Sequence, residues 1–280
     1  MISRLQSSRR WLEQSVGGKL FSAGLSVAFW LLIWHWAATK VNEPLLLPTP
    51  GSVFDRLCEL CLTQTFWLYS LRSLLRVVLG ILSGALTAAL IAALTAGIPL
   101  FYALVRPLIT VIKTTPVASF IILALLWLNE GVLPIFISFL MVFPVVWSNL
   151  HTALCSVPAP WRELALVFRL PLWRRIRRIY LPHAAPFFLS ACQSSMGLAW
   201  KAGIAAEAIA LPALSIGKKL MDSKIYLETV DLFAWTSVVV LLSLLLEAFA
   251  SLLFRRMRAL ERSGRTMQNH QDGGEPLCQG

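Results

Sequence analysis

Two ionisable residues, Lys201 and Glu207, are the strongest candidates for chemistry, because both lie inside a long apolar stretch of the sequence. A charge placed in hydrocarbon costs about 3 kcal/mol, so each side chain should face protein or water. Six residues correspond to about 600° of helical turn, which leaves the two side chains about 120° from a common face. We therefore expect that they do not pair with each other.

An enzyme would need a nucleophile with a base, paired carboxylates or metal-ligand spacing within such stretches. The serine motif G-x-S-G is absent, and the lone C-x-x-C at Cys58 and Cys61 fits one face of an ordinary helix. No two histidines are spaced as a metal pair. They are His35, His151, His183 and His270. The sequence therefore predicts neither catalytic residues nor a metal site.

A phosphate-binding loop, G-x-x-x-x-G-K-[ST], occurs nowhere in the chain. The nearest candidate, Gly217-Lys218-Lys219, lacks the earlier glycine and the hydroxyl residue. Any ATP hydrolysis must be supplied by another chain, and we expect no cofactor in this one.

The composition is far too apolar for a soluble domain, with 57% hydrophobic residues, 14% charged residues and a mean hydropathy of +0.70. It predicts an all-α integral membrane protein. The net charge of +11 is compatible with nucleic-acid binding, but basic residues that cluster beside apolar spans indicate membrane orientation instead. We expect no nucleic-acid partner, and no cleavable signal, since the first apolar stretch lacks a small-residue cleavage site.

Six stretches have about the length that a helix needs to cross the hydrocarbon, which is about 20 apolar residues. They lie at about residues 20–39, 77–98, 108–128, 132–150, 184–211 and 232–254. In the second stretch small residues recur every four positions, a pattern that lets helices approach closely. This stripe consists of Gly80, Gly84, Ala88, Ala92 and Ala96.

Prolines interrupt two of these stretches. The third carries a break at Thr114-Thr115-Pro116, and the fourth contains Pro134 and Pro144. Proline within a span is tolerated where neighbours or water satisfy the freed carbonyls, so both helices should pack inward.

Basic residues at the ends of the spans predict the orientation. The segments 1–19, 158–182 and 255–280 hold four, six and five Lys and Arg residues respectively, whereas the basic residues of the opposite side are matched by acids. The positive-inside rule therefore predicts both termini in the cytoplasm. We expect a cytoplasmic N-terminal tail at 1–19, a transmembrane domain at 20–254, and a cytoplasmic C-terminal tail at 255–280 that is disordered at its end.

The deep residues leave alternatives open. Glu207 either borders a translocation path or makes a structural hydrogen bond to a neighbouring span. Lys201 either meets an anionic substrate or snorkels or pairs elsewhere. Trp200 and Trp127 either line a gate or face lipid. The path candidates are Thr115, Pro116, Trp200, Lys201 and Glu207.

The loop at 158–182 is rich in arginine and is built more firmly than a connector. Its last part, between Pro171 and Pro182, has apolar residues at helical spacing with arginines on the other face, which predicts an amphipathic helix. A second short helix is predicted upstream, so the loop should form a helix, an elbow and a helix. The alternatives are arginines that only set topology, or a helix that lies on anionic lipid.

This loop resembles the EAA loop of permease subunits of binding-protein-dependent ABC importers. The matching residues are Glu163-Leu-Ala-Leu-Val-Phe-Arg169 and, nine residues later, Ile179-Tyr-Leu-Pro182. Further segments are similar to the nitrate, sulfonate and taurine branch, in the same order. They are Leu47-Pro-Thr-Pro50, Ser73-Leu-Leu-Arg-Val-Val-Leu-Gly80, Lys113-Thr-Thr-Pro-Val-Ala118, Gly197-Leu-Ala-Trp-Lys-Ala-Gly-Ile-Ala-Ala-Glu207 and Ser215-Ile-Gly217.

The resemblance implies a type I importer permease of six spans that acts as a homodimer. Its coupling loop docks on separate ATPase subunits, which hold ATP and magnesium, and an extracytoplasmic binding protein delivers the solute. By position, the docking residues are Glu163, Ala165, Arg169, Ile179 and Pro182. Nitrate, sulfonates, taurine and heterocyclic vitamin precursors are the candidate substrates. Membrane lipid is the remaining partner, and the location is the bacterial inner membrane.

Arg169 departs from the family, which usually has glycine there. Because arginine in a left-handed conformation costs about 1 kcal/mol, we expect a right-handed elbow with Leu170 extended before Pro171.

An ion-coupled secondary transporter is the alternative function. It would need internal repeats and embedded acids. The sequence shows no convincing repeat, and Glu207 is the main deep acid, with Glu247 nearer the end of the sixth span.

Overall fold

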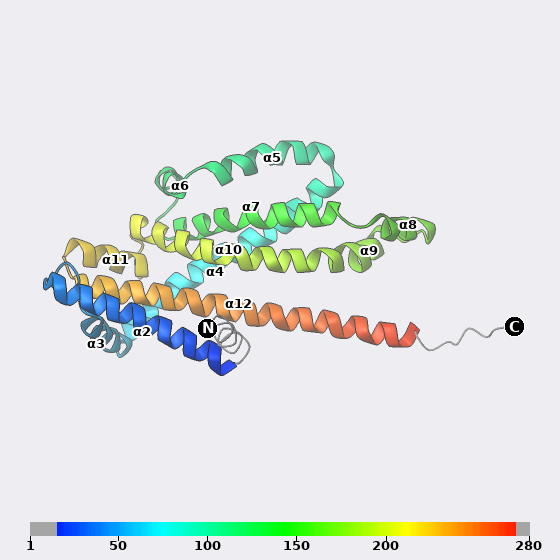
Figure 1. The fold of residues 1–280 in the computed structure, drawn as a ribbon. Helices are drawn as coiled ribbons and strands as arrows, with labels where there is room; N and C mark the ends of the chain where they lie inside the picture. The colour runs from blue at the N-terminus through cyan, green and yellow to red at the C-terminus, as the bar shows by residue number, and fades with distance from the viewer. Residues whose placement is uncertain (1–15, 273–280) are drawn as a thin grey trace, which may run out of the picture. The chain divides into compact units, whose positions relative to one another are not determined.

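The computed structural model describes residues 16–272, and in this part of the chain every regular element is a helix. The elements in chain order are α2 (Val16–Val41), α3 (Pro50–Cys61), α4 (Gln64–Gly97), α5 (Pro99–Thr114), α6 (Val117–Ala124), α7 (Leu133–Cys155), α8 (Ala159–Val167), α9 (Leu172–Arg175), a π-helical turn (Ile176–Tyr180), α10 (Leu181–Ala210), α11 (Ile216–Ile225) and α12 (Thr229–Asp272) (Figure 1). The prediction of an all-α protein is confirmed.

Five of the six predicted spans correspond to one long helix each, namely α2, α4, α7, α10 and α12. Three of the described helices are long and apolar enough to cross a membrane by length and hydropathy. These are α4, α7 and the part of α12 from Thr229 to Leu252. A fourth span results if the bent pair of α5 and α6 counts as one, and the number six stays a prediction.

The third predicted span is not one continuous helix. α5 ends at Thr114, α6 begins at Val117, and the two are bent by 104° at the break. Pro116 has no amide to continue the ladder and holds Thr115 in an extended conformation, with a ψ of 132°. The sequence identified the break but not its sharpness.

The predicted tails lie partly outside the described residues, which exclude 1–15 and 273–280. Within the C-terminal tail, α12 continues as a helix to Asp272.

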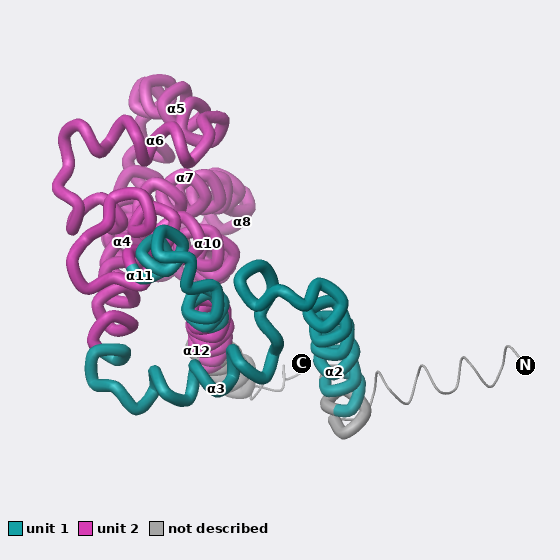
Figure 2. The backbone as a smooth tube through the Cα atoms, turned by 90° about the vertical axis from the view of Figure 1, so that its left-hand side faces the viewer, with its two compact units in different colours: residues 1–67, 219–237 teal, residues 68–218, 238–280 magenta. Residues whose placement is uncertain are grey.

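The chain divides into two compact units, which Figure 2 shows in different colours. Unit 1 consists of residues 1–67 and 219–237. Within it, Trp34 donates from Nε1 to the carbonyl of Pro48 at 3.0 Å and stacks on Phe233. Arg56 donates from Nη2 to Asp231 at 3.0 Å, and hydrogen bonds to Asp231 and then Glu59 raise the pKa of Arg56 above its ordinary value.

Unit 2 consists of residues 68–218 and 238–280, and its core is built on α7 and α10. The inward packing predicted from the prolines is found in α7, where 61% of the apolar window is buried, against 17% in α12. Pro134 and Pro144 are both buried.

The small-residue stripe of α4 packs as predicted over most of its length. Gly80, Gly84, Ala88 and Ala92 are buried, whereas Ala96 is exposed. A Cβ on Gly80 would collide with the carbonyl of Ile135, so glycine is required for the close approach of α4 and α7.

Candidate functional site

The elbow of the loop is a C-terminal capping motif of α8. The amide of Arg169 donates to the carbonyl of Leu166, and the amide of Leu170 donates to that of Ala165, both at 3.0 Å. This pair of bonds is the Schellman motif, which satisfies the last carbonyls of a helix. The Arg175 side chain adds a third bond, from Nε to the carbonyl of Leu170 at 2.9 Å.

The expectation of a right-handed elbow is wrong. Arg169 has a φ of 47°, in the left-handed region that glycine would adopt at no steric cost. The left-handed conformation costs an L-residue about 1–2 kcal/mol. The two capping bonds offset this cost, since each contributes about 1 kcal/mol. The elbow therefore keeps the geometry that glycine allows, although the residue is arginine.

Arg169→Gly is expected to stabilise the elbow by about 0.5–1 kcal/mol. Removing the Cβ relieves the left-handed strain, while the greater freedom of glycine in the unfolded chain offsets part of that gain. Hydrogen exchange at Leu170 measures the effect and is expected to slow about threefold. Arg162→Gly, an exposed position inside α8, is the matched control and is expected to speed exchange, because glycine destabilises helix interiors. Faster exchange in Arg169→Gly would contradict the role of strain.

The second part of the loop is not a separate amphipathic helix that ends at Pro182. α9 passes through the π-helical turn directly into α10. The Leu181 amide donates to the carbonyl of Ile176, five residues back, and Pro182 occupies the first turn of α10. A proline needs no amide partner in a first turn, so the chain continues without a break.

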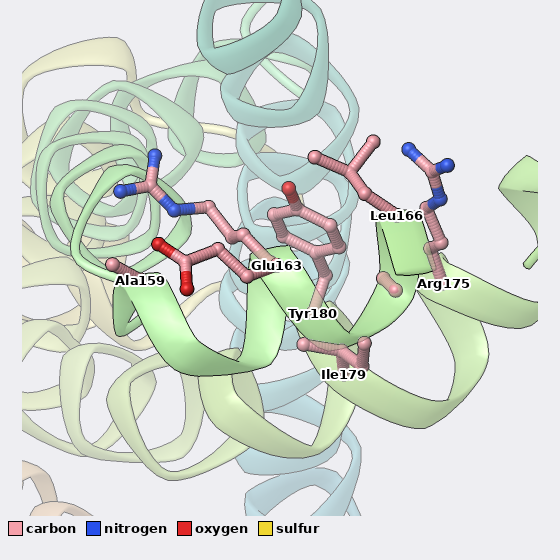
Figure 3. A pocket seen from close by; sticks show the side chains of 8 residues that line it. Ala159, Glu163, Leu166, Arg175, Ile179 and Tyr180 are labelled. Carbon is pink, nitrogen blue, oxygen red and sulfur yellow. The ribbon is translucent and has the colours of Figure 1, made fainter. Parts of the chain in front are cut away.

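Three of the five predicted docking residues line a pocket of about 360 Å³ between α8 and the segment that follows the elbow (Figure 3). Glu163 is exposed, Ala165 is only 2% exposed, and Ile179 is half-buried. All three line the pocket, together with Arg175 and Tyr180, whereas Arg169 and Pro182 do not. The structure thus brings three of the five together.

Large apolar side chains of the loop are exposed. Their exposed fractions run from 44% to 78%, and they belong to both sides of the elbow. They are Trp161, Leu164, Leu166, Val167, Phe168, Leu172 and Trp173. An apolar patch of this kind on a rigid loop is typical of a protein or membrane contact.

Glu207 lies at the centre of a buried hydrogen-bond network in unit 2. Its side chain is fully buried. Its Oε2 accepts from the Ser73 hydroxyl at 2.6 Å and from the Gly217 amide at 3.2 Å. Its Oε1 accepts from Arg76 at 3.1 Å in an ion pair. These contacts support the structural interpretation of Glu207, because the carboxylate has no face open to a solute.

The network also holds the connection between α10 and α11. Arg76 donates to the carbonyls of Ala213 and Leu214 at 2.9 and 3.3 Å, and the Ile216 amide donates to Ser73 Oγ at 2.9 Å. Ser73 and Arg76 were not predicted from the sequence as partners of Glu207. The signal was present, because both lie in one matched segment and are three residues apart on a helix face.

The other path candidates lie in different environments. Trp200 is buried and donates from Nε1 to the carbonyl of Val239 at 3.1 Å. Lys201 is exposed and does not pair with Glu207, as expected from their spacing. Thr115 and Pro116 form the bend between α5 and α6. Trp127 is 73% exposed.

No group of three or more His, Cys, Asp or Glu side chains that could hold a metal occurs among the described residues. The exposed apolar side chains of the loop offer a contact surface, and the hydrogen bonds of Glu207 make it a structural joint.

Residues 85–259 match the family described as the binding-protein-dependent transport system inner membrane component. The chain belongs to this family. The resemblance found in the EAA loop is thereby confirmed, and the chain has the fold of a type I importer permease.

Named relatives of this permease serve different solutes. The chain is 28% identical to the riboflavin transport system permease protein of Chloroflexus aurantiacus, over 86% of this chain and 91% of that protein. It is 24% identical to the taurine transport system permease protein of Escherichia coli, over 83% and 86%. It is also 24% identical to the nitrate import permease protein of Synechocystis, over 84% and 88%. The permease is a multi-pass inner membrane transport subunit.

Proposed function

We propose that the chain is the permease of an ATP-driven importer that takes up a small solute from an extracytoplasmic binding protein. Two copies form the path, with six spans each and with both termini in the cytoplasm. The 158–182 loop docks on ATPase subunits that hold ATP and magnesium. Closure of the ATPases on ATP then opens the path outward, and hydrolysis returns it inward, so the permease acts as a two-state element.

The observation that carries this proposal is the capped elbow with its pocket. Three main-chain acceptors fix the angle between α8 and the segment after the elbow, while Glu163 and the large apolar side chains stay exposed. A rigid lever with an unpartnered apolar surface can receive force from a partner, which a flexible connector cannot. The same surface could lie on lipid, but the rigid pocket favours a protein partner.

The relatives support a small solute without identifying it. Riboflavin, taurine and nitrate appear in their names and differ in size and charge. The name of a further relative, in Bacillus subtilis, specifies aliphatic sulfonates. Nitrate, sulfonates, taurine and heterocyclic vitamin precursors therefore remain the candidates.

Uptake into proteoliposomes that contain the permease, its ATPase and its binding protein tests the energy source. We expect uptake to require ATP inside the vesicles and to persist when ionophores collapse the proton and sodium gradients. Uptake that needs a gradient and continues without ATP would identify an ion-coupled secondary transporter instead.

A further inference from the structure

Two charged side chains of unit 2 are exposed within long helices of the permease, Lys201 in α10 and Glu247 in α12. Glu247 belongs to the apolar span that runs from Thr229 to Leu252. In the described part of the chain, neither residue lies within ion-pair distance of an opposite charge. Because a charge in hydrocarbon is costly, an unpaired charge within a span is expected to face water rather than lipid.

Glu247 reaches across to α10 at Gly197. A Cβ on Gly197 would lie 2.7 Å from Glu247 Oε1, so the carboxylate lies close against Gly197. The same two helices are joined by the hydrogen bond from Trp200 to the carbonyl of Val239. The carboxylate therefore lies beside α10 at Gly197.

Lys201 shares the face of α10 that Glu247 approaches. It lies four residues after Gly197, and residues at this spacing lie above one another on a helix. Helical side chains lean toward the N-terminus, so Lys201 leans back toward Gly197. Ser194 is exposed and lies seven residues before Lys201, which places it on this face too. We call Ser194, Gly197, Lys201 and Glu247 the polar face.

We propose that the polar face lines the solute path and binds a small zwitterionic solute in passage. Lys201 binds its anionic group, and Glu247 binds its ammonium group. This inference rests on the proposed function, in which the chain forms the path of a solute, and it names the substrate class.

The two opposite charges select against solutes that carry only one. A simple anion at Lys201 is repelled by the Glu247 carboxylate, which lies beside Gly197, one turn before Lys201 on α10, and a simple cation at Glu247 is repelled by Lys201. A solute with both groups satisfies both side chains at once. Discrimination of this kind depends on the repulsive element as much as on the attractive one.

A reporter cysteine tests the location and the selectivity together. Ser194→Cys keeps both charges and is introduced into the full chain after its five native cysteines are replaced. N-ethylmaleimide reacts with the thiolate, which forms in water and not in hydrocarbon. Labelling is measured in open membrane fragments with taurine, with isethionate, which has a hydroxyl in place of the amine, or with ethanolamine. These probes are a zwitterion, an anion and a cation.

We expect Ser194→Cys to be labelled, and taurine to slow its labelling about threefold at twice the dissociation constant, as occupancy requires. Isethionate and ethanolamine are expected to have little effect at the same concentration. The protection by taurine is expected to be lost in Lys201→Gln and in Glu247→Gln. A merely structural role of either charge would leave this protection unchanged.

Leu245→Cys is the control, because Leu245 is 64% exposed but lies about 200° around α12 from Glu247. We expect it to stay unlabelled. Absent labelling at Ser194→Cys, or equal labelling of both cysteines, would overturn the water-lined face. Equal protection by isethionate, or protection that survives both glutamine variants, would overturn zwitterion binding. The assay needs neither ATPase nor binding protein, so failure of ATP-driven uptake is a separate result.

Discussion

Glu207→Ala is expected to destabilise the fold by about 3–5 kcal/mol, the usual cost of removing one partner of a buried ion pair. Arg76 would keep its charge in a site where its side chain is only 14% exposed. The amide of Gly217 and the hydroxyl of Ser73 would lose their acceptor as well. Arg76 also donates to the carbonyls of Ala213 and Leu214 in the connection between α10 and α11. The loss of Glu207 should therefore loosen this connection too.

The thermal midpoint of the purified permease in detergent measures this loss, and we expect a decrease of about 10 °C. Lys201→Ala is the matched control, since Lys201 lies on the same helix but is exposed, and its midpoint should stay within about 1–2 °C. In Arg76→Met combined with Glu207→Leu, part of the loss should be recovered, because no buried charge remains unpaired. A midpoint for Glu207→Ala no lower than that of Lys201→Ala would refute the structural role.

Sequence reasoning placed Glu207 correctly as a residue that must avoid lipid, because the cost of a charge in hydrocarbon does not depend on tertiary contacts. It could not choose between a path and a structural bond. That choice depends on which face of α10 meets α4, which the spacing of Lys201 and Glu207 does not determine. The partners Ser73 and Arg76 are more than 130 residues away in the sequence.

At the elbow, local backbone propensity led to a wrong prediction. It favoured a right-handed Arg169, but the residue is left-handed. A preference of about 1 kcal/mol is small beside two main-chain hydrogen bonds that close only in the left-handed geometry. Pro116 lies between these cases: its missing amide predicted a break, but the bend of 104° depends on how α6 packs against α7 and α10.

The composition of α10 explains why hydropathy does not identify it as a membrane span. This helix is 30 residues long but carries a lysine, a glutamate and many small or polar residues, and it is not among the three described helices that are long and apolar enough to cross a membrane. Twelve of its residues are buried. A helix enclosed by others can cross a membrane without a strongly apolar surface, so hydropathy alone can underestimate the number of spans.

Ala165→Trp is expected to abolish ATP-driven uptake and to reduce recovery of the ATPase with the permease by at least about tenfold. Ala165 lines the pocket and is only 2% exposed, and its carbonyl accepts a capping bond from the Leu170 amide. An indole there has to push α8 away from the segment after the elbow. Overpacking of this kind costs about 1–3 kcal/mol, and about 1.4 kcal/mol is a tenfold change in binding.

Co-purification through a tag on the permease measures the docking, and the amount of permease in the membrane fraction measures insertion. Insertion should be unchanged, because the substitution lies in the loop and not in a span. Ala165→Ser adds little volume, so this control should retain most of the bound ATPase. Glu163→Lys reverses an exposed charge of the pocket and, like Ala165→Trp, should reduce recovery of the ATPase. Normal ATPase recovery with both Ala165→Trp and Glu163→Lys would show that force enters the permease somewhere other than this loop.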